Sequence, residues 1–200
     1  MTAPVEAVAP ATGSCSSAGA STAEVIGFRP VTAADGPAIE AMVERSSPAS
    51  RYGRFLAPVH SLPVGQLERI LHPGLCGGAW VAITATPLPQ ASSTRFGRGD
   101  GVGQLGPDVV ALADWAIGPD GSAEVGLLVQ DDRQRQGIGS ALLAIVTARA
   151  RAAGARALVA SVLDGSTHVQ RMVEEAFGPS TVTSDGHVRV IRSAPSVPRL

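Results

Sequence analysis

The sequence predicts one α/β domain in which a sheet is covered by helices. Two observations lead to this prediction. Short runs of β-branched and aromatic residues alternate with segments of helical periodicity, and the 200-residue chain has room for a single core. Such alternation is typical of a sheet with helices packed against it. We expect a disordered tail over 1–24, which is rich in small and polar residues, then the domain over 25–193 and a second tail over 194–200.

The N-terminal part of the domain predicts a strand followed by helices. The expected elements are a strand at 25–29, a capped helix, and two short helices at 50–56 and 66–71. Thr32 and Asp35 have the spacing of a capping box, which marks a helix start. That helix is expected to end before Pro48, because a residue that precedes proline avoids helical geometry. By analogy, the two short helices would form a lid over a substrate cleft.

The central part predicts three strands, two of them in a hairpin. The expected strands cover 79–83, 109–117 and 123–129. Between the first two strands, residues 87–107 hold five glycines and three prolines without apolar rhythm. We interpret this segment as a surface insertion in preference to a mobile functional loop. Gly118-Pro119-Asp120-Gly121 is a turn sequence, so the last two strands are expected to pair as a hairpin.

The C-terminal part predicts two more helices and three more strands. In chain order these are a helix at 138–152, a strand at 158–163, a helix at 166–176, and strands at 181–183 and 188–191. The first helix places Ile138, Leu142, Ile145 and Val146 on one apolar stripe, and Gly154 is positioned as its terminal glycine.

The composition excludes several classes of protein. A net charge of −1 argues against a nucleic-acid binder or a polybasic membrane anchor. No basic leader and no apolar run of about 20 residues is present, so we expect neither secretion nor membrane insertion. Cys15 and Cys76 belong to no metal-binding or disulfide pattern, which favours a reducing cytoplasm and no metal. We expect Cys76 to be a buried structural thiol and not an acyl-carrying nucleophile.

The strongest local signal is the stretch 129–143, where a predicted strand leads through a Gly-x-Gly turn into a helix. Gly137 and Gly139 allow close backbone approach, and the first amide groups of a helix attract an anion. Arg133 and Arg135 add positive charge. A glycine turn made for packing alone is the structural alternative. The patterns of dinucleotide and Walker loops are missing, so a different phosphate carrier is expected.

The Gln134-x-x-Gly137-x-Gly139 spacing resembles the signature of the GNAT N-acetyltransferase superfamily, whose pyrophosphate loop follows the fourth strand and binds coenzyme A. Phe28-Arg29-Pro30-Val31-Thr32, Ser50-Arg51-Tyr52 and Arg54-Phe55-Leu56 are similar to the bacterial Pat-like protein-lysine acetyltransferase branch, and the resemblance covers about 25–191. It implies a mixed, mostly antiparallel sheet of six to seven strands, about four flanking helices, and a splay after the fourth strand. It also implies acetyl-CoA as cosubstrate and an amine acceptor, with a protein lysine favoured over a small molecule. A homodimer is left open.

The resemblance further implies which residues hold acetyl-CoA. The pantetheine arm would contact backbone groups of Leu127, Leu128 and Val129. The residues expected to cradle the pyrophosphate are Gln134, Arg135, Gln136, Gly137, Ile138, Gly139 and Ser140. Ser166 would add a contact at the start of the last helix, where many relatives have asparagine.

Glu124 is the candidate general base, because Pat-like enzymes have a glutamate at that place. In a strand the side chains of Ala123, Val125 and Leu127 point to one face, and that of Glu124 points to the other. A solvent-facing glutamate in an ordinary cross-strand pair is the alternative. The general acid is unassigned, since the only tyrosine, Tyr52, lies far upstream of the last helix, where many relatives carry one.

These residues predict direct acetyl transfer. Glu124 would take a proton from the amine, directly or through water, and the free amine would attack the thioester while an N–H near Val129 stabilises the oxyanion. The missing tyrosine motivates a second hypothesis, a non-catalytic acyl-CoA-binding module with a degenerate site. The sequence leaves the acceptor and the acyl preference open.

Overall fold

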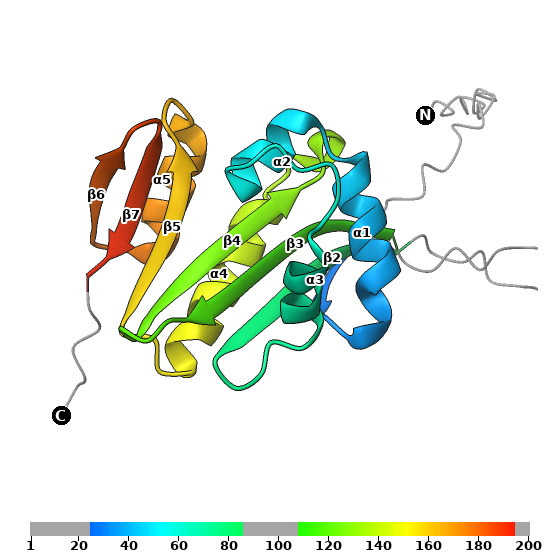
Figure 1. Ribbon diagram of the computed structural model, residues 1–200, viewed down its shortest axis with the longest axis horizontal. Coiled ribbons are helices and arrows are strands. Elements are labelled where there is room, and N and C mark those ends of the chain that lie inside the picture. Colours follow the sequence, from blue (N-terminus) through cyan, green and yellow to red (C-terminus); the bar gives the residue numbers. More distant parts are fainter. Residues whose placement is uncertain (1–24, 86–107, 195–200) are drawn as a thin grey trace, which may run out of the picture.

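The computed structural model describes residues 25–85 and 108–194 (Figure 1). Its strands are β1 (Val25–Pro30), β2 (Gly77–Ala85), β3 (Asp108–Ile117), β4 (Ser122–Val129), β5 (Ala157–Leu163), β6 (Ser180–Asp185) and β7 (Val188–Ser193). Its α-helices are α1 (Gly36–Arg45), α2 (Pro48–Phe55), α3 (Val64–Leu71), α4 (Ile138–Ala152) and α5 (Thr167–Phe177). Two short 3-10 turns, η1 (Ala33–Asp35) and η2 (Asp131–Arg133), precede α1 and α4.

The strands form one seven-stranded sheet in the order β1-β2-β3-β4-β5-β7-β6. All neighbouring pairs are antiparallel except β4 and β5, which are parallel. Helices α4 and α5 cover one face, and α1, α2 and α3 lie on the other (Figure 1). This is the mixed, mostly antiparallel α/β architecture that the family resemblance implies, with five α-helices among the described residues where about four were expected.

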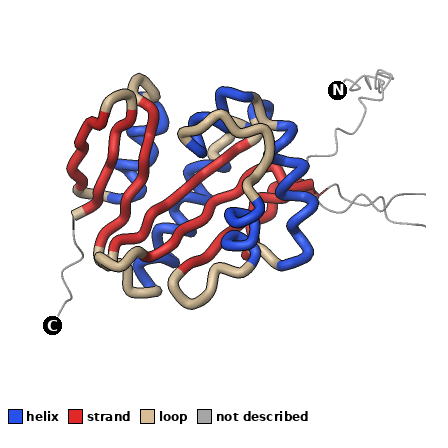
Figure 2. Tube along the Cα trace, in the orientation of Figure 1, coloured by secondary structure: helices blue, strands red, loops and turns tan. Residues whose placement is uncertain are grey.

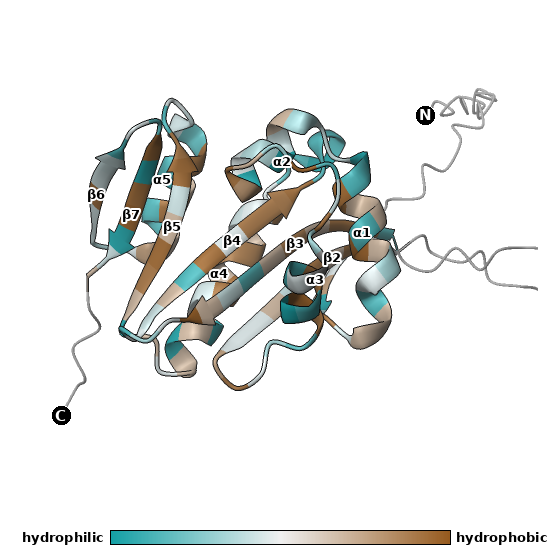
Figure 3. Cartoon of the chain, viewed as in Figure 1, coloured by the Kyte–Doolittle hydropathy of each residue, from teal (hydrophilic) through white to brown (hydrophobic). Residues whose placement is uncertain are grey.

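Two hydrophobic cores lie on the two faces of the sheet. Alternate residues of β4 point to opposite faces, so Ala123 and Val125 pack beneath α4 while Leu128 packs with α1 and α3. Figure 3 shows the same division, with hydrophobic residues along the central strands and hydrophilic ones on the outer helix surfaces. Along α4 the buried face differs from the predicted stripe, because Leu143 is fully buried while Ile145, which was predicted to be buried, is half-buried.

The sheet opens between β4 and β5. These strands pair only over Ser122–Glu124 and Ala157–Val159, and beyond Glu124 they diverge (Figure 2). The predicted splay after the fourth strand is therefore confirmed. It leaves one edge of β4 without a strand partner from Val125 onward, in the middle of the sheet.

Local signals account for most element boundaries. Gly121 has a left-handed φ of 77° in the turn between β3 and β4, and Gly118 N–H donates to Ser122 O at 2.8 Å. The Asp35 carboxylate accepts a hydrogen bond from Thr32 N–H at 2.7 Å, as expected for a capping box, although a 3-10 turn comes before the α-helix. Both hairpin and cap were predicted.

The prediction for Cys76 is wrong, and three other predictions lie wholly or mostly outside the described residues. Cys76 is exposed and not buried, because it precedes the first paired residue of β2. The tail expected at 1–24, the insertion at 87–107 and all but the first residue of the tail expected at 194–200 are outside the described residues. Among the described residues, no helix is long and apolar enough to cross a membrane, and no group of three potential ligands could hold a metal ion.

Candidate active site

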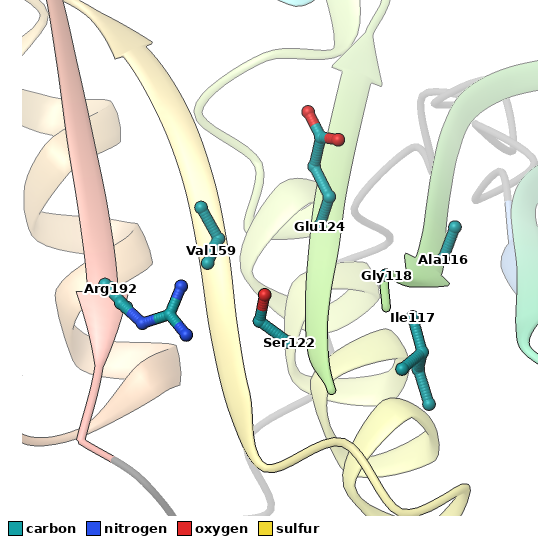
Figure 4. A pocket seen from close by; sticks show the side chains of 7 residues that line it. All are labelled: Ala116, Ile117, Gly118, Ser122, Glu124, Val159 and Arg192. Atoms are coloured by element: carbon teal, nitrogen blue, oxygen red, sulfur yellow. The ribbon is translucent and has the colours of Figure 1, made fainter. Parts of the chain in front are cut away.

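Glu124 stands at the vertex of the splay. It is the last residue of β4 that pairs with β5, and its partner is Val159. Its side chain is exposed on the face opposite α4, as the parity of the strand predicts. Glu124 lines a pocket of about 300 Å³ together with Ser122, Val159 and Arg192. Figure 4 shows these lining side chains. A carboxylate is thus accessible where the two strands separate.

The backbone groups of β4 beyond Glu124 alternate in direction. Gly118 N–H donates to Ser122 O, and Gln130 N–H donates to Val110 O at 3.0 Å, so even-numbered residues direct their backbone groups to β3. Val125, Leu127 and Val129 direct theirs into the splay. Leu128 therefore pairs with β3 through its backbone, and its side chain is buried in the core with α1.

The turn between β4 and α4 has the shape of an anion-binding loop. Gly137 adopts a left-handed φ of 80°, and a Cβ added there would meet nothing within 4 Å. Gly139 lies against β4 and α5, since an added Cβ would come within 3.5 Å of Leu127, Val129 and Met172. The first amide groups of α4 have no carbonyl partner within the helix and carry the positive end of its dipole. Close approach and conformation thus both require the glycines.

Side chains of this loop differ in what they contact. Gln134 Nε2 donates to Ser50 Oγ at 3.0 Å and to Val129 O at 3.1 Å, while Gln136 Nε2 donates to Asp132 O at 3.0 Å. Both glutamine side chains therefore brace the loop. Arg135 and Ser140 are exposed, and Ile138 is buried in the core beneath the sheet.

Helix α2 is tied to this loop through its N-terminus. The Asp131 carboxylate accepts hydrogen bonds from Ser47 N–H at 2.8 Å, Ser47 Oγ at 2.6 Å and Ser50 Oγ at 2.8 Å. Burial opposes ionisation of Asp131, but these hydrogen bonds outweigh it and lower its pKa. The lid helix and the glycine loop are consequently one connected unit.

A second contact fixes the middle of α2 above β4. Arg54 Nη2 forms an ion pair with Asp114 Oδ1 at 2.5 Å, with side-chain exposures of 13% and 25%. The guanidinium lies on Gly126, the residue of β4 that pairs with Asp114. A Cβ at Gly126 would be 2.7 Å from Arg54 Nε and closer still to Cζ and Nη2. Gly126 is thus the floor on which the guanidinium rests, on the same face as Glu124.

A third contact joins α2 to the far side of the splay. The Tyr52 hydroxyl and His187 Nε2 are 3.2 Å apart, and their rings stack with centroids 6.5 Å apart. His187 lies in the turn between β6 and β7, so the chain's only tyrosine is brought to the open splay. Ser166 is the N-cap residue of α5, and its side chain makes no capping hydrogen bond.

The contacts of α2 were missed by reasoning from the sequence. Arg54 was placed in a predicted lid helix, and the sequence carries no signal that pairs it with Asp114. The glycine at 126, between the apolar residues Val125 and Leu127 inside a strand, is the signal that could have indicated a close approach.

Comparison with known proteins gives a consistent result. Residues 94–178 match the model of the Acetyltransferase (GNAT) family. No curated protein sequence matches the chain. The GNAT domain of S. lividans PAT is similar in structure, with a TM-score of 0.64 and 25% identity over 84% of this chain and 95% of that one.

Two more distant structures share the fold. That of yncA from Salmonella typhimurium, with its cofactor acetyl-CoA, has a TM-score of 0.60 and 16% identity over 88% of this chain and 97% of that one. Diaminobutyrate acetyltransferase EctA from Paenibacillus lautus, in complex with L-2,4-diaminobutyric acid and coenzyme A, has a TM-score of 0.59 and 16% identity over 88% of this chain and 99% of that one.

Proposed function

We propose that this chain, whose residues 94–178 match the GNAT acetyltransferase family, transfers an acetyl group from acetyl-CoA to a protein lysine and that Glu124 is the general base. The observation that carries the proposal is the position of Glu124, an exposed carboxylate at the vertex of the splay. The similarity to the GNAT domain of S. lividans PAT favours a protein acceptor over a small molecule.

The residues around the splay fit acetyl-CoA. The pyrophosphate would bind the first amide groups of α4, beside Gly137 and Gly139, where no side chain obstructs it and the helix dipole favours an anion. The pantetheine arm would use the backbone groups of Val125 and Leu127, which point into the splay. Val129 would contact acetyl-CoA only through its N–H, since its carbonyl oxygen accepts from Gln134 Nε2. Since Leu128 pairs with β3, we assign it no such contact. Exposed Arg135 and Ser140, and Ser166 at the start of α5, complete the proposed contacts.

The chemistry that follows needs one base and one oxyanion donor. A lysine ammonium has an ordinary pKa near 10.4, so it must lose a proton before it can attack a thioester. Glu124 accepts that proton, directly or through water, and the free amine forms the new C–N bond as the C–S bond breaks. Coenzyme A leaves as its thiolate, and the second proton lost by the amine converts it to the thiol. The N–H of Val129, directed into the splay, donates to the carbonyl oxygen as negative charge develops. Acetyl-CoA supplies the acyl group.

Substitution of Glu124 separates catalysis from cofactor binding. Glu124→Gln should keep acetyl-CoA affinity and lower turnover at least ~100-fold, the usual effect of removing a positioned base. Glu68→Gln, an exposed glutamate on α3, is the matched control and should leave turnover unchanged. Unchanged turnover in Glu124→Gln would remove this residue from the mechanism.

Cofactor binding is tested independently by thermal unfolding. Acetyl-CoA at ~100 times its dissociation constant should stabilise the fold by ~2.7 kcal/mol. The Gly137→Glu variant should not be stabilised by acetyl-CoA, because the substitution places a side chain and a negative charge in the phosphate site. Thermal unfolding of this variant without ligand is the control that shows whether it folds. Binding without turnover on any amine would favour the non-catalytic acyl-CoA-binding module.

A further inference from the structure

A row of side chains crosses the sheet at the vertex of the splay. Glu124 on β4 pairs with Val159 on β5, and Val159 pairs with Arg192 on β7. Register partners point to the same face of a sheet, so all three side chains lie on the pocket beside Glu124 (Figure 4). Two strand spacings separate the Cα atoms of Glu124 and Arg192 by about 10 Å. A carboxylate and a guanidinium therefore face one pocket from its two sides.

The guanidinium of Arg192 keeps most of its hydrogen-bonding capacity. The Arg192 side chain is 46% exposed. Among the described residues, 25–85 and 108–194, its guanidinium makes one hydrogen bond, from Nη2 to Asp120 Oδ2 at 3.2 Å. Asp120 is itself held by Ser122, whose N–H and Oγ lie 3.0 and 2.6 Å from Asp120 Oδ1. An exposed ion pair of this kind is weak. Arginine presents a planar fork of donors, so Arg192 can still bind a carboxylate in the pocket.

The surface between the two charges is small and apolar. Val159 lies between Glu124 and Arg192 in the row, and Ala116 flanks Glu124 on the β3 side. Neither residue offers a hydrogen-bonding side chain. A bound molecule would meet Glu124 at one end, Arg192 at the other and Val159 between them. Ser122, whose hydroxyl donates to Asp120, also lines the pocket.

We propose that the acceptor carries a carboxylate close to its reactive amine, with Glu124 facing the amine and Arg192 binding the carboxylate. This inference rests on the proposed acetyltransferase function and names the class of acceptor for the same site. A lysine beside an aspartate or glutamate in a protein has this charge arrangement. The spacing suits it, because about 10 Å between the two strands leaves room for both side chains and both ligand groups.

Peptide acetylation with charge-exchanged substrates tests the proposal. Two peptides, identical except for a glutamate or an arginine directly after a single lysine, are compared by kcat/KM. Wild-type protein should prefer the lysine-glutamate peptide about tenfold, the effect of one charged hydrogen bond. Arg192→Gln should remove the preference and Arg192→Glu should reverse it. Arg69→Glu, an exposed arginine on α3, is the control and should keep the wild-type preference.

The outcomes separate this inference from the function on which it rests. If both peptides are acetylated equally, or if Arg192→Gln and Arg192→Glu retain the wild-type preference while unfolding at the wild-type temperature, the inference is overturned and the acetyltransferase function stands. If wild-type protein acetylates neither peptide but acetylates free lysine, a small amino acid supplies the carboxylate and the protein acceptor is excluded. No acetylation of any of these amines overturns both.

Discussion

Gly126 offers a sharp test of how α2 is held over the active site. The guanidinium of Arg54 rests on the Cα of Gly126, and a methyl group there would occupy the same space as Cζ and Nη2. In Gly126→Ala the flexible end of Arg54 must swing away, since β4 is fixed on both faces by the cores. The move breaks the ion pair with Asp114 and the contact of Arg54 with the Phe55 ring, 5.2 Å from its centroid.

The expected cost follows from the exposure of the pair. A hydrogen bond to a charged group contributes roughly 1.5–3 kcal/mol, and the 13% and 25% exposures of Arg54 and Asp114 reduce that value through solvent screening. We therefore expect Gly126→Ala to lower the free energy of unfolding by about 1–2 kcal/mol. Arg54→Ala should cost a similar amount, because it removes the same ion pair.

A double-mutant cycle decides whether the two residues act through one contact. Urea unfolding of the two single variants and of the double variant gives the coupling energy. The double variant should cost no more than either single one, since the methyl group then has space and the pair is already lost. Additive losses, or a neutral Gly126→Ala, would show that the guanidinium does not rest on Gly126.

Three further predictions concern local structure. Gly137→Ala should lower the free energy of unfolding by about 1–2 kcal/mol, because the φ of 80° at this residue is unfavourable for alanine although a Cβ would have space. Gly137→Asn should lower it less, since asparagine tolerates this conformation, and equal losses in thermal unfolding would contradict this reasoning. Tyr52→Phe keeps the stacked ring but loses the hydroxyl contact with His187, so urea unfolding should show a loss of about 0.5 kcal/mol; 2 kcal/mol or more would be too large for an exposed hydrogen bond. Hydrogen bonds from Arg29 hold the pKa of the Asp35 carboxyl well below its ordinary value of 3.8 in the folded state, although burial opposes this. The ionised carboxylate therefore stabilises the fold above pH 3.8, and this stabilisation is lost as the pH falls through the lower pKa of the folded state. Arg29→Gln should therefore lose less stability than wild type when acidified below about pH 4, and identical acid profiles would refute the assignment.

The fold was predictable to a large extent because its signals are local. The turn at 118–121, the glycines of the loop before α4, and the alternation of β4 all act within a few residues of the chain. The face of β4 to which Glu124 points could be predicted without tertiary information, since successive side chains of a strand alternate between its two faces. Cys76 was predicted wrongly for the complementary reason: an apolar residue type indicates burial only if the chain around it is packed, and here it precedes the sheet.

The sequence by itself determined the order of strands and helices along the chain, the glycine turn before α4 and the face on which the carboxylate of Glu124 lies, because each depends on periodicity or on the conformations that a residue allows. Only the tertiary structure decided which distant side chains meet. Tyr52 and His187 are 135 residues apart in the chain, Ser47 and Asp131 are 84 apart, and Arg54 and Asp114 are 60 apart. Such contacts follow from how the helices cross the sheet, which no pattern along the chain encodes. The row from Glu124 to Arg192 likewise exists only because β5 and β7 are neighbours in the sheet.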